Sequence, residues 1–416
     1  MTKPPLRRVH FGAFYPNDHH HTLWSLSPKG SQIEFEAFRH FAQSAERGLF
    51  DFVFLAEANW LQEDKGSVIE HAILDKPDSL TTLAALAAET NSIGLAATIG
   101  TTFSDPFHVA RGLATLQAIS GDRAGWNVVT SHTGFGVGAS TNFRPGRLVE
   151  HHERYVVAQA FLDEVFAYWS EATRGAGGFT NPSIIQAGGS VEGKELAARN
   201  ANVIFAGRQT IENSRRFVTE MSERAAAHGR GELVIMPSTA FVLGTSTEDA
   251  LERQKHWREL EMTPRVAQFL LTEAWGEGYE DYDVDGPIPA NDPSPEHADR
   301  YAKGKVGGER DGQKLIAGWR AIAERDNLSV RELFSTVLAR RDFVGTPASV
   351  AEDINHWVQS RAADGFVVNP SVVPSGIDEF VDQVIPELQE RGVYRTEYSG
   401  STLQGHLQET FAEETS

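Results

Sequence analysis

Two hydrophobic patterns alternate along the chain. Short runs rich in Val, Ile and Phe predict buried β-strands, and longer stretches with apolar residues at i, i+3 and i+4 predict amphipathic helices. The stretch from Phe35 to Leu49 places Phe38, Ala42 and Ala45 on one helical face between two such runs. The predicted strands cover residues 9–14, 51–57, 93–99, 125–131, 183–189, 202–207, 233–244 and 365–371.

Each predicted strand is followed by a predicted helix. This repetition predicts an α/β fold in which a parallel sheet closes into a (β/α)8 barrel, a TIM barrel with insertions. An open, doubly wound sheet is the alternative, because βα repetition alone does not determine closure. We expect a single domain over residues 1–416, with an acidic, Gly- and Pro-rich loop insertion at about 276–312. The Ser-x-x-Glu motif from Ser329 to Glu332 predicts a capping box at the start of a helix in the C-terminal third of the chain.

Composition narrows the class of protein. Of the 416 residues, 40% are hydrophobic and 23% charged, as in ordinary globular proteins. The net charge of -19 argues against nucleic acid or an anionic membrane as the main partner. We find no signal peptide and no apolar run long enough to span a membrane, and therefore expect a cytoplasmic protein. The absence of cysteine excludes disulfides, thiolate catalysis and cysteine-ligated metal sites.

In a barrel enzyme the active site lies at the C-terminal ends of the strands. These ends carry mostly small, hydroxyl or amide residues, which suit a polar, planar and mostly neutral ligand held by several hydrogen bonds. The predicted rim comprises Phe14-Tyr15, Glu57-Ala58-Asn59, Thr98 to Thr101, Asn127 to Ser131, Gly188-Gly189-Ser190, Ala206-Gly207-Arg208, Ser238-Thr239 and Asn369-Pro370-Ser371.

The fifth predicted strand ends in Gly188-Gly189-Ser190 before a helix begins. The free backbone N–H groups of such a helix start form an anion site suited to a single phosphate. An ordinary β–α turn with Ser190 as the N-cap is the alternative. Gly188 to Lys194 also match the first seven positions of a Walker A loop, but Glu195 replaces the hydroxyl residue that would bind magnesium, which disfavours a nucleoside triphosphate.

Histidines cluster at residues 19–21 and 151–152, but consecutive side chains point apart and no H-E-x-x-H spelling occurs, so we expect no metal site. His151 and Tyr155 are spaced i, i+4 and therefore share a helix face near the rim, where they could bind one ligand. The alternative is that they are ordinary residues of a helix start. Neither the G-x-S-x-G motif of a nucleophile elbow nor the G-x-G-x-x-G motif of a dinucleotide-binding site occurs at a predicted strand–helix turn.

The stretch SGDRAGWNVVTS at residues 120–131 resembles a signature of the nitrilotriacetate and dibenzothiophene-sulfone monooxygenase family, a branch of the bacterial-luciferase-like flavin monooxygenases. The stretches ERGLFDFVFLAE, IGLAATIGTTFSDPFHVAR, HHERY, IIQAGGS, FVGTPASVAEDI, ADGFVVNP and VIPELQERGVYRTEYSGSTL resemble the family in the same order. The resemblance implies a two-component monooxygenase. A separate flavin reductase would supply reduced FMN, which the enzyme would use with O2 to hydroxylate or cleave a small organic substrate. It also suggests a homo-oligomer.

The resemblance further implies which residues contact the flavin. The phosphate of FMN would lie at Gly189-Ser190. Thr98 and Asn127 would flank the O2 that the flavin activates and would be the catalytic residues. Gly125 is expected to allow close packing of the barrel wall around Trp126. The implied flavin contacts are Glu57, Thr98, Asn127, His151, Tyr155, Gly189 and Ser190.

Three departures from the family pattern stand out: Glu57 replaces Asp, Asp122 replaces Gly, and the segment 170–182 is several tens of residues shorter than in the family. That segment corresponds to a loop over the substrate pocket, and either a truly short loop or an omitted segment accounts for its length. A flavin- or deazaflavin-linked reductase or dehydrogenase and an inactive flavin-binding protein are the alternative functions. Sulfones, aminopolycarboxylates, halogenated aromatics and thioethers all fall within the family's range of substrates.

Overall fold

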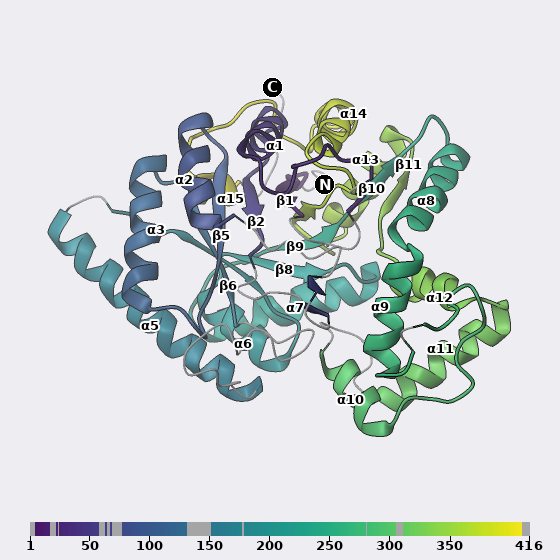
Figure 1. The fold of residues 1–416 in the computed structure, drawn as a ribbon. Helices are drawn as coiled ribbons and strands as arrows, with labels where there is room; N and C mark the ends of the chain where they lie inside the picture. The colour runs from purple at the N-terminus through teal and green to yellow at the C-terminus, as the bar shows by residue number, and fades with distance from the viewer. Residues whose placement is uncertain are drawn as a thin grey trace.

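Eight parallel strands form the centre of the molecule and close into a barrel (Figure 1). The structure is a computed structural model that describes residues 5–16, 22–23, 25–57, 63–64, 67–68, 77–130, 151–176, 179–279, 281–304 and 311–409. The predicted closed barrel is thereby confirmed. Its strands, in order around the barrel, are β1 (His10–Tyr15), β12 (Gly365–Val368), β9 (Val234–Thr239), β8 (Val203–Gly207), β7 (Ser183–Ala187), β6 (Ala124–Val129), β5 (Gly94–Gly100) and β2 (Phe52–Leu55), which pairs with β1.

The strands are apolar on both faces because both faces are buried. In β2, Val53 and Leu55 belong to the core between strands and helices, whereas Phe52 and Phe54 belong to the cluster inside the barrel. The same alternation places Phe14 of β1 inside the barrel. The continuous apolar runs in the sequence follow from this double burial.

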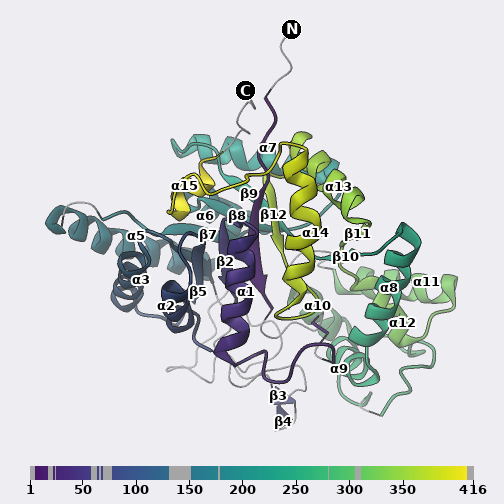
Figure 2. The ribbon, with the colours of Figure 1, turned by 90° about the horizontal axis from the view of Figure 1, so that it is seen from above.

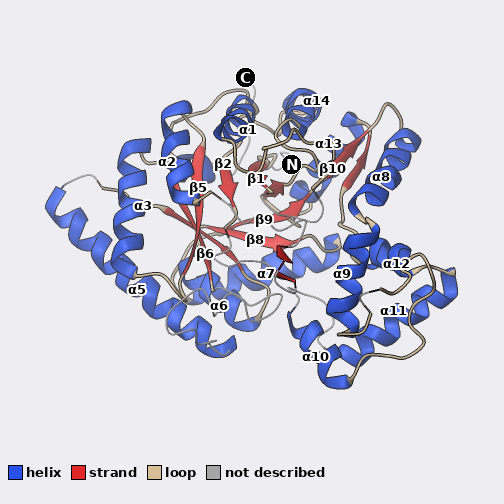
Figure 3. Cartoon of the chain, viewed as in Figure 1, coloured by secondary structure: helices blue, strands red, loops and turns tan. Residues whose placement is uncertain are grey.

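Helices surround the barrel (Figures 2 and 3). Most begin at a side chain that accepts a backbone N–H, such as Asp78, Asp105 and Thr346, which satisfies one of the free donors of the first turn. α1 and α14 lie side by side over β1. The surrounding helices are α1 (Phe35–Arg47), α2 (Ser79–Glu89), α3 (Pro106–Ser120), α5 (His151–Ala176), α6 (Val191–Asn200), α7 (Ile211–Ala227), α13 (Pro347–Gln359) and α14 (Gly376–Glu390).

The chain leaves the barrel between β9 and β12. The apolar run 233–244, predicted as one strand, is two: β9 ends before Ala240, and β10 (Phe241–Leu243) pairs outside the barrel with β11 (Phe343–Gly345). Between β10 and β11 lie α8 (Thr247–Glu261), α9 (Pro264–Trp275), α10 (Pro295–Gly304), α11 (Gly312–Asp326) and α12 (Val330–Val337). Two further two-residue strands, β3 (Glu63–Asp64) and β4 (Ser67–Val68), form a separate hairpin.

Helices α9 to α12 have their own hydrophobic cluster at one side of the barrel (Figure 1). Trp319 is its centre, with ring centroids 6.2 Å from Trp275 and 5.8 Å from Tyr301. The prediction of a loop over the whole of 276–312 was therefore wrong, because α10 lies within it and packs on α11. The capping box at Ser329 and Glu332 is confirmed.

The turn between α3 and β6 has two residues in the left-handed region, Gly121 with φ 69° and Asp122 with φ 65°. Asp tolerates this conformation better than most side chains, and Asp122 also accepts a hydrogen bond from Thr180 at 2.7 Å. The next residue, Arg123, is buried and donates to the carbonyl oxygens of Ser120, Ala87, Thr90 and Ile93. Its guanidinium therefore ties the ends of α2 and α3 to the start of the barrel strands.

The C-terminal segment fills the N-terminal end of the barrel. Leu403 of α15 (Leu403–Leu407) lies inside the barrel, and a Cβ added at Gly94 would stand only 2.7 Å from its side chain. At Gly125 an added Cβ would lie 3.1 Å from Leu403 and 3.2 Å from Cβ of Ala96. Gly125 thus makes room for a leucine as well as for the neighbouring wall, whereas Trp126 faces outward into the helix-covered core.

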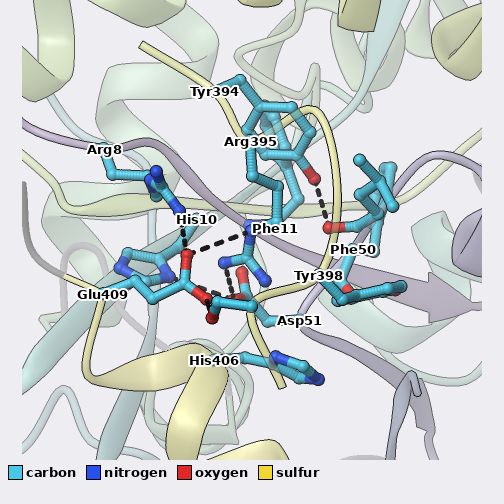
Figure 4. Close-up of polar contacts among 12 residues, drawn as sticks. Arg8, His10, Phe11, Phe50, Asp51, Tyr394, Arg395, Tyr398, His406 and Glu409 are labelled. Carbon is cyan, nitrogen blue, oxygen red and sulfur yellow. Dashed lines mark hydrogen bonds and ion pairs between the residues drawn. The ribbon is translucent and has the colours of Figure 1, made fainter. Parts of the chain in front are cut away.

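Ionic contacts hold this segment in place (Figure 4). The buried carboxylate of Asp51 accepts hydrogen bonds from the backbone N–H of Phe11 at 2.7 Å and from Arg395 Nη2 at 2.6 Å. Burial alone would raise the pKa of Asp51, but the charges of Arg395 and His10 hold it well below its usual value. Glu409 pairs with Arg8 near the same cluster. Because this end is filled, the opposite end of the barrel is the place for a ligand.

Candidate functional site

Thr98 and Asn127 lie side by side at the C-terminal end of the barrel, which we call its mouth. They are direct partners in the register of β5 and β6, and Asn127 Nδ2 donates to Thr98 Oγ1 at 3.1 Å. Both are buried, yet Asn127 Oδ1 has no hydrogen-bond partner within the described part of the chain. A buried amide oxygen without a donor is costly, so this oxygen is a candidate acceptor for a ligand.

An aromatic layer lies on the inner side of this pair. It consists of Phe14, Phe54 and Phe205, whose ring centroids are 4.9 to 6.4 Å apart. Phe54 is level with Ala96 in the register of β2 and β5, two residues before Thr98 on the same face. The aromatic layer therefore provides an apolar floor beneath the polar pair.

Glu57 is attached to the first turn of α2. Its Oε2 accepts hydrogen bonds from the backbone N–H of Ser79 at 3.0 Å and from its hydroxyl at 2.7 Å. The hydroxyl of Ser79 also lies 3.1 Å from the carbonyl oxygen of Thr98. The positive end of the helix dipole favours a carboxylate at this position. Ser79 was not predicted as a site residue, since nothing in the sequence marks its contact with Glu57.

The start of α6 brings together two more predicted residues. Ser190 Oγ accepts the backbone N–H of Gly193 at 3.0 Å as the N-cap and donates to Tyr155 OH at 3.1 Å. Next to it, a Cβ added at Gly189 would meet no heavy atom of the other described residues within 4 Å. Free space, two hydroxyls and a helix N-terminus form a site with the chemistry of a phosphate cradle. His151 is the first residue of α5, and its side chain lies outside the described residues.

The resemblance to a Walker A loop has no structural counterpart. Lys194 Nζ lies 2.7 Å from Glu220 on α7, away from Gly188 and Gly189. Glu195 pairs with His228 and Arg224 in the same outer layer. Neither charged side chain faces the cradle.

Other predicted rim residues have different roles. Arg208 stacks on the ring of Phe343 at 3.7 Å and donates to the carbonyl oxygen of Arg341, so it is tied to β11. Burial lowers the pKa of Arg208 to about 10, which leaves it charged at neutral pH. Asn369, by contrast, is 5% exposed, and its Oδ1 has no hydrogen-bond partner in the described ranges. Ala58, Asn59 and Ser131 lie outside the described residues.

The described part of the chain contains no group of three or more His, Cys, Asp or Glu side chains able to hold a metal ion. None of its helices is long and apolar enough to cross a membrane.

Comparison with known proteins places this geometry in a family. The family model of luciferase-like monooxygenases matches residues 9–364. The chain is 34% identical to N-acetyl-S-(2-succino)cysteine monooxygenase of Bacillus subtilis (strain 168), over 96% of each chain. It is 33% identical to nitrilotriacetate monooxygenase component A of Aminobacter aminovorans, over 96% of this chain and 93% of the relative.

Solved structures agree with the sequence comparison. A riboflavin lyase crystallised with modified FMN and its substrate riboflavin superimposes with a TM-score of 0.75 at 25% identity, over 96% of this chain and 95% of the lyase. The similarity thus extends over the whole barrel and its helices. The chain belongs to the luciferase-like monooxygenase family.

Proposed function

We propose that the protein is the oxygenase component of a two-component system that uses reduced FMN and O2 to oxidise a small organic substrate. The observation that carries the proposal is the buried pair of Thr98 and Asn127 beside the phosphate cradle at Ser190. Asn127 Oδ1 has no partner among the residues that the structure describes. Membership of the family supports monooxygenase chemistry. A relative that is named as one component of a monooxygenase supports a separate reductase.

The residues at the mouth fit FMN. The cradle of Gly189, Ser190 and Tyr155 suits a single phosphate. The two cations of α6 pair elsewhere, Lys194 with Glu220 and Arg199 with Asp163. We assign His151 to the same site because it precedes Tyr155 by one helical turn. Glu57 follows β2 and accepts a hydrogen bond from Ser79 at the start of α2, so it would contact the flavin from the side of β2.

Thr98 and Asn127 together offer an acceptor and a donor to the planar ring system of the flavin. Asn127 Oδ1 is the free acceptor, and the hydroxyl proton of Thr98 is available because Thr98 Oγ1 accepts, rather than donates, the bond with Asn127. When bound in its reduced form, FMN supplies the electrons that activate O2. A preorganised hydroxyl donor in a buried site stabilises negative charge that develops nearby, which is the catalytic role we assign to Thr98 and Asn127.

We further propose the partner, the cellular location and the oligomeric state of the protein. A flavin reductase supplies reduced FMN, the protein works in the cytoplasm as a homo-oligomer, and residues 1–416 form one domain. Neither nucleic acid nor a membrane is a partner, in keeping with the net charge of -19.

An oxygen-uptake assay tests the proposal. The protein is incubated with FMN, NADH, a general flavin reductase and panels of sulfones, aminopolycarboxylates, halogenated aromatics and thioethers. We expect one class to raise O2 consumption and to yield a product that incorporates label from ¹⁸O2. Substrate reduction without O2 would favour a reductase, and FMN binding with no substrate-dependent O2 uptake would favour an inactive flavin-binding protein.

A further inference from the structure

Asn369 continues β12 into the mouth of the barrel. Its backbone N–H donates to the carbonyl oxygen of Thr239 at 2.8 Å, so the strand pairing with β9 extends to this residue. Val367, two residues earlier, belongs to the cluster inside the barrel, and the alternation of a strand therefore turns Asn369 to the same side. The side chain is buried, but none of the described residues forms a hydrogen bond with its Oδ1.

Asn369 and Asn127 lie on opposite walls. In the barrel order, three strands separate β12 from β6 in either direction. Apart from Glu57, which follows β2, the strand-end residues assigned to FMN come from the other wall: Thr98 and Asn127 from β5 and β6, and Ser190 from the turn after β7. A flavin held there satisfies Asn127 and leaves the acceptor of Asn369 to a second ligand.

We propose that Asn369 is a substrate-binding residue that selects substrates carrying an N–H or O–H donor next to an apolar group. The inference rests on the proposed function, which places a flavin on the β5–β7 wall. The apolar group would pack on the aromatic layer of Phe14, Phe54 and Phe205, and the donor would satisfy Asn369 Oδ1. Alcohols, secondary amides and ammonium groups meet this requirement. Sulfones, thioethers and ethers do not, because they offer only acceptors.

A first test asks whether the amide serves stability. Asn369→Leu removes a buried amide oxygen that has no partner among the described residues, and it keeps the branched shape of the side chain. We expect its Tm to equal or exceed that of the wild type, because no described donor loses its acceptor when Oδ1 is removed. Asn355→Leu is the matched control, since Asn355 Oδ1 on α13 is likewise buried without a partner, in the outer helix layer. A Tm lower by more than about 5 °C for Asn369→Leu would give the amide a structural role and overturn the inference.

A second test measures selectivity with two small probes, benzyl alcohol and benzyl methyl ether. Their dissociation constants are determined by ligand-detected NMR on the FMN-loaded wild type, Asn369→Leu and Asn355→Leu. A hydrogen bond to an otherwise unsatisfied partner corresponds to about tenfold in affinity. We expect the alcohol to bind about tenfold more tightly than the ether in the wild type and in Asn355→Leu, and within about twofold of it in Asn369→Leu.

The outcomes separate the two proposals. Failure of the wild type to bind FMN contradicts the proposed function. FMN binding without preference for the alcohol, no binding of the alcohol at all, or an undiminished preference in Asn369→Leu overturns only the assignment of Asn369.

Discussion

Asn127 donates its amide to the hydroxyl of Thr98 at 3.1 Å, and the two residues are direct partners on neighbouring strands. The register of β5 and β6 therefore fixes the relative position of both groups. This bond uses one of the two N–H donors of Asn127 and one acceptor site of Thr98, so the amide oxygen and the hydroxyl proton are the groups that we propose contact a ligand. Rigid strands hold these groups more precisely than loops would.

Removing the hydroxyl of Thr98 is expected to uncouple O2 use from product formation. Thr98→Val keeps the shape but leaves no donor for negative charge that develops at the flavin, and the loss of one such donor lowers turnover about 10²-fold. Product and H2O2 formed per NADH are the quantities to measure. Thr115→Val, on the outer helix α3, is the control and should behave like the wild type. Full coupling in Thr98→Val would remove Thr98 from the chemistry.

Ser190→Glu is expected to abolish FMN binding, because it places a carboxylate against the phosphate. FMN binding is followed by quenching of flavin fluorescence. Ser246→Glu is the matched control, since Ser246 caps α8 in the same way by accepting the N–H of Asp249 at 3.2 Å. Equal FMN affinity of Ser190→Glu and the wild type would argue against the cradle.

Arg123 is expected to be important for stability rather than for binding. It is 2% exposed and holds four carbonyl oxygens with a planar group of five donors. Burial lowers the pKa of Arg123 from its usual value. Lysine cannot reach the same acceptors, so Arg123→Lys should lower the free energy of unfolding by about 3 kcal/mol or more. Arg216→Lys, at an exposed pair with Glu212, should change it by less than about 0.5 kcal/mol in the same urea titration.

Glu261 is expected to make the protein less stable as the pH rises. Burial, opposed by the charge of Arg340, raises the pKa of Glu261 from 4.5 to about 7. A raised pKa means that the folded state binds the proton more tightly than the unfolded state, so this contribution is complete below pH 4.5 and is lost as the pH passes 7. In the wild type the loss amounts to at most about 3 kcal/mol.

Urea unfolding at pH 5 and pH 8 measures this effect. The decrease in the free energy of unfolding between the two values should be smaller in Glu261→Gln than in the wild type, whereas Glu259→Gln, at an exposed position on the same helix, should match the wild type. An identical decrease in Glu261→Gln would show that another group is responsible.

The barrel was predictable because its strands are buried on both faces and therefore appear as continuous apolar runs. For the same reason, the break between β9 and β10 at Ala240 was not predicted. A continuous apolar run does not show where a strand leaves the barrel. Helix α10 was missed because Gly, Pro and acidic residues dominate its surroundings, whereas its stability depends on Trp319 of α11. Leu403, which fills the space beside Gly94, is likewise a contact that only the folded chain reveals.

The candidate site was predictable in part. The family motifs indicated Thr98 and Asn127, and strand register brings them together. Tyr155 and Ser190 also meet as expected from a shared ligand. Ser79 could not be predicted, because it stands 22 positions after Glu57 and the two meet only when β2 and α2 pack together.

We propose that the mouth of the barrel binds a flavin through its phosphate. Anaerobic titration of the wild-type protein with reduced FMN and with reduced riboflavin tests it most directly, because the two ligands differ only by that group. We predict that FMN binds at least about 100-fold more tightly, owing to the helix start at Ser190 and the hydroxyl of Tyr155. Equal affinities for FMN and riboflavin would show that Ser190 and Tyr155 do not form a phosphate site.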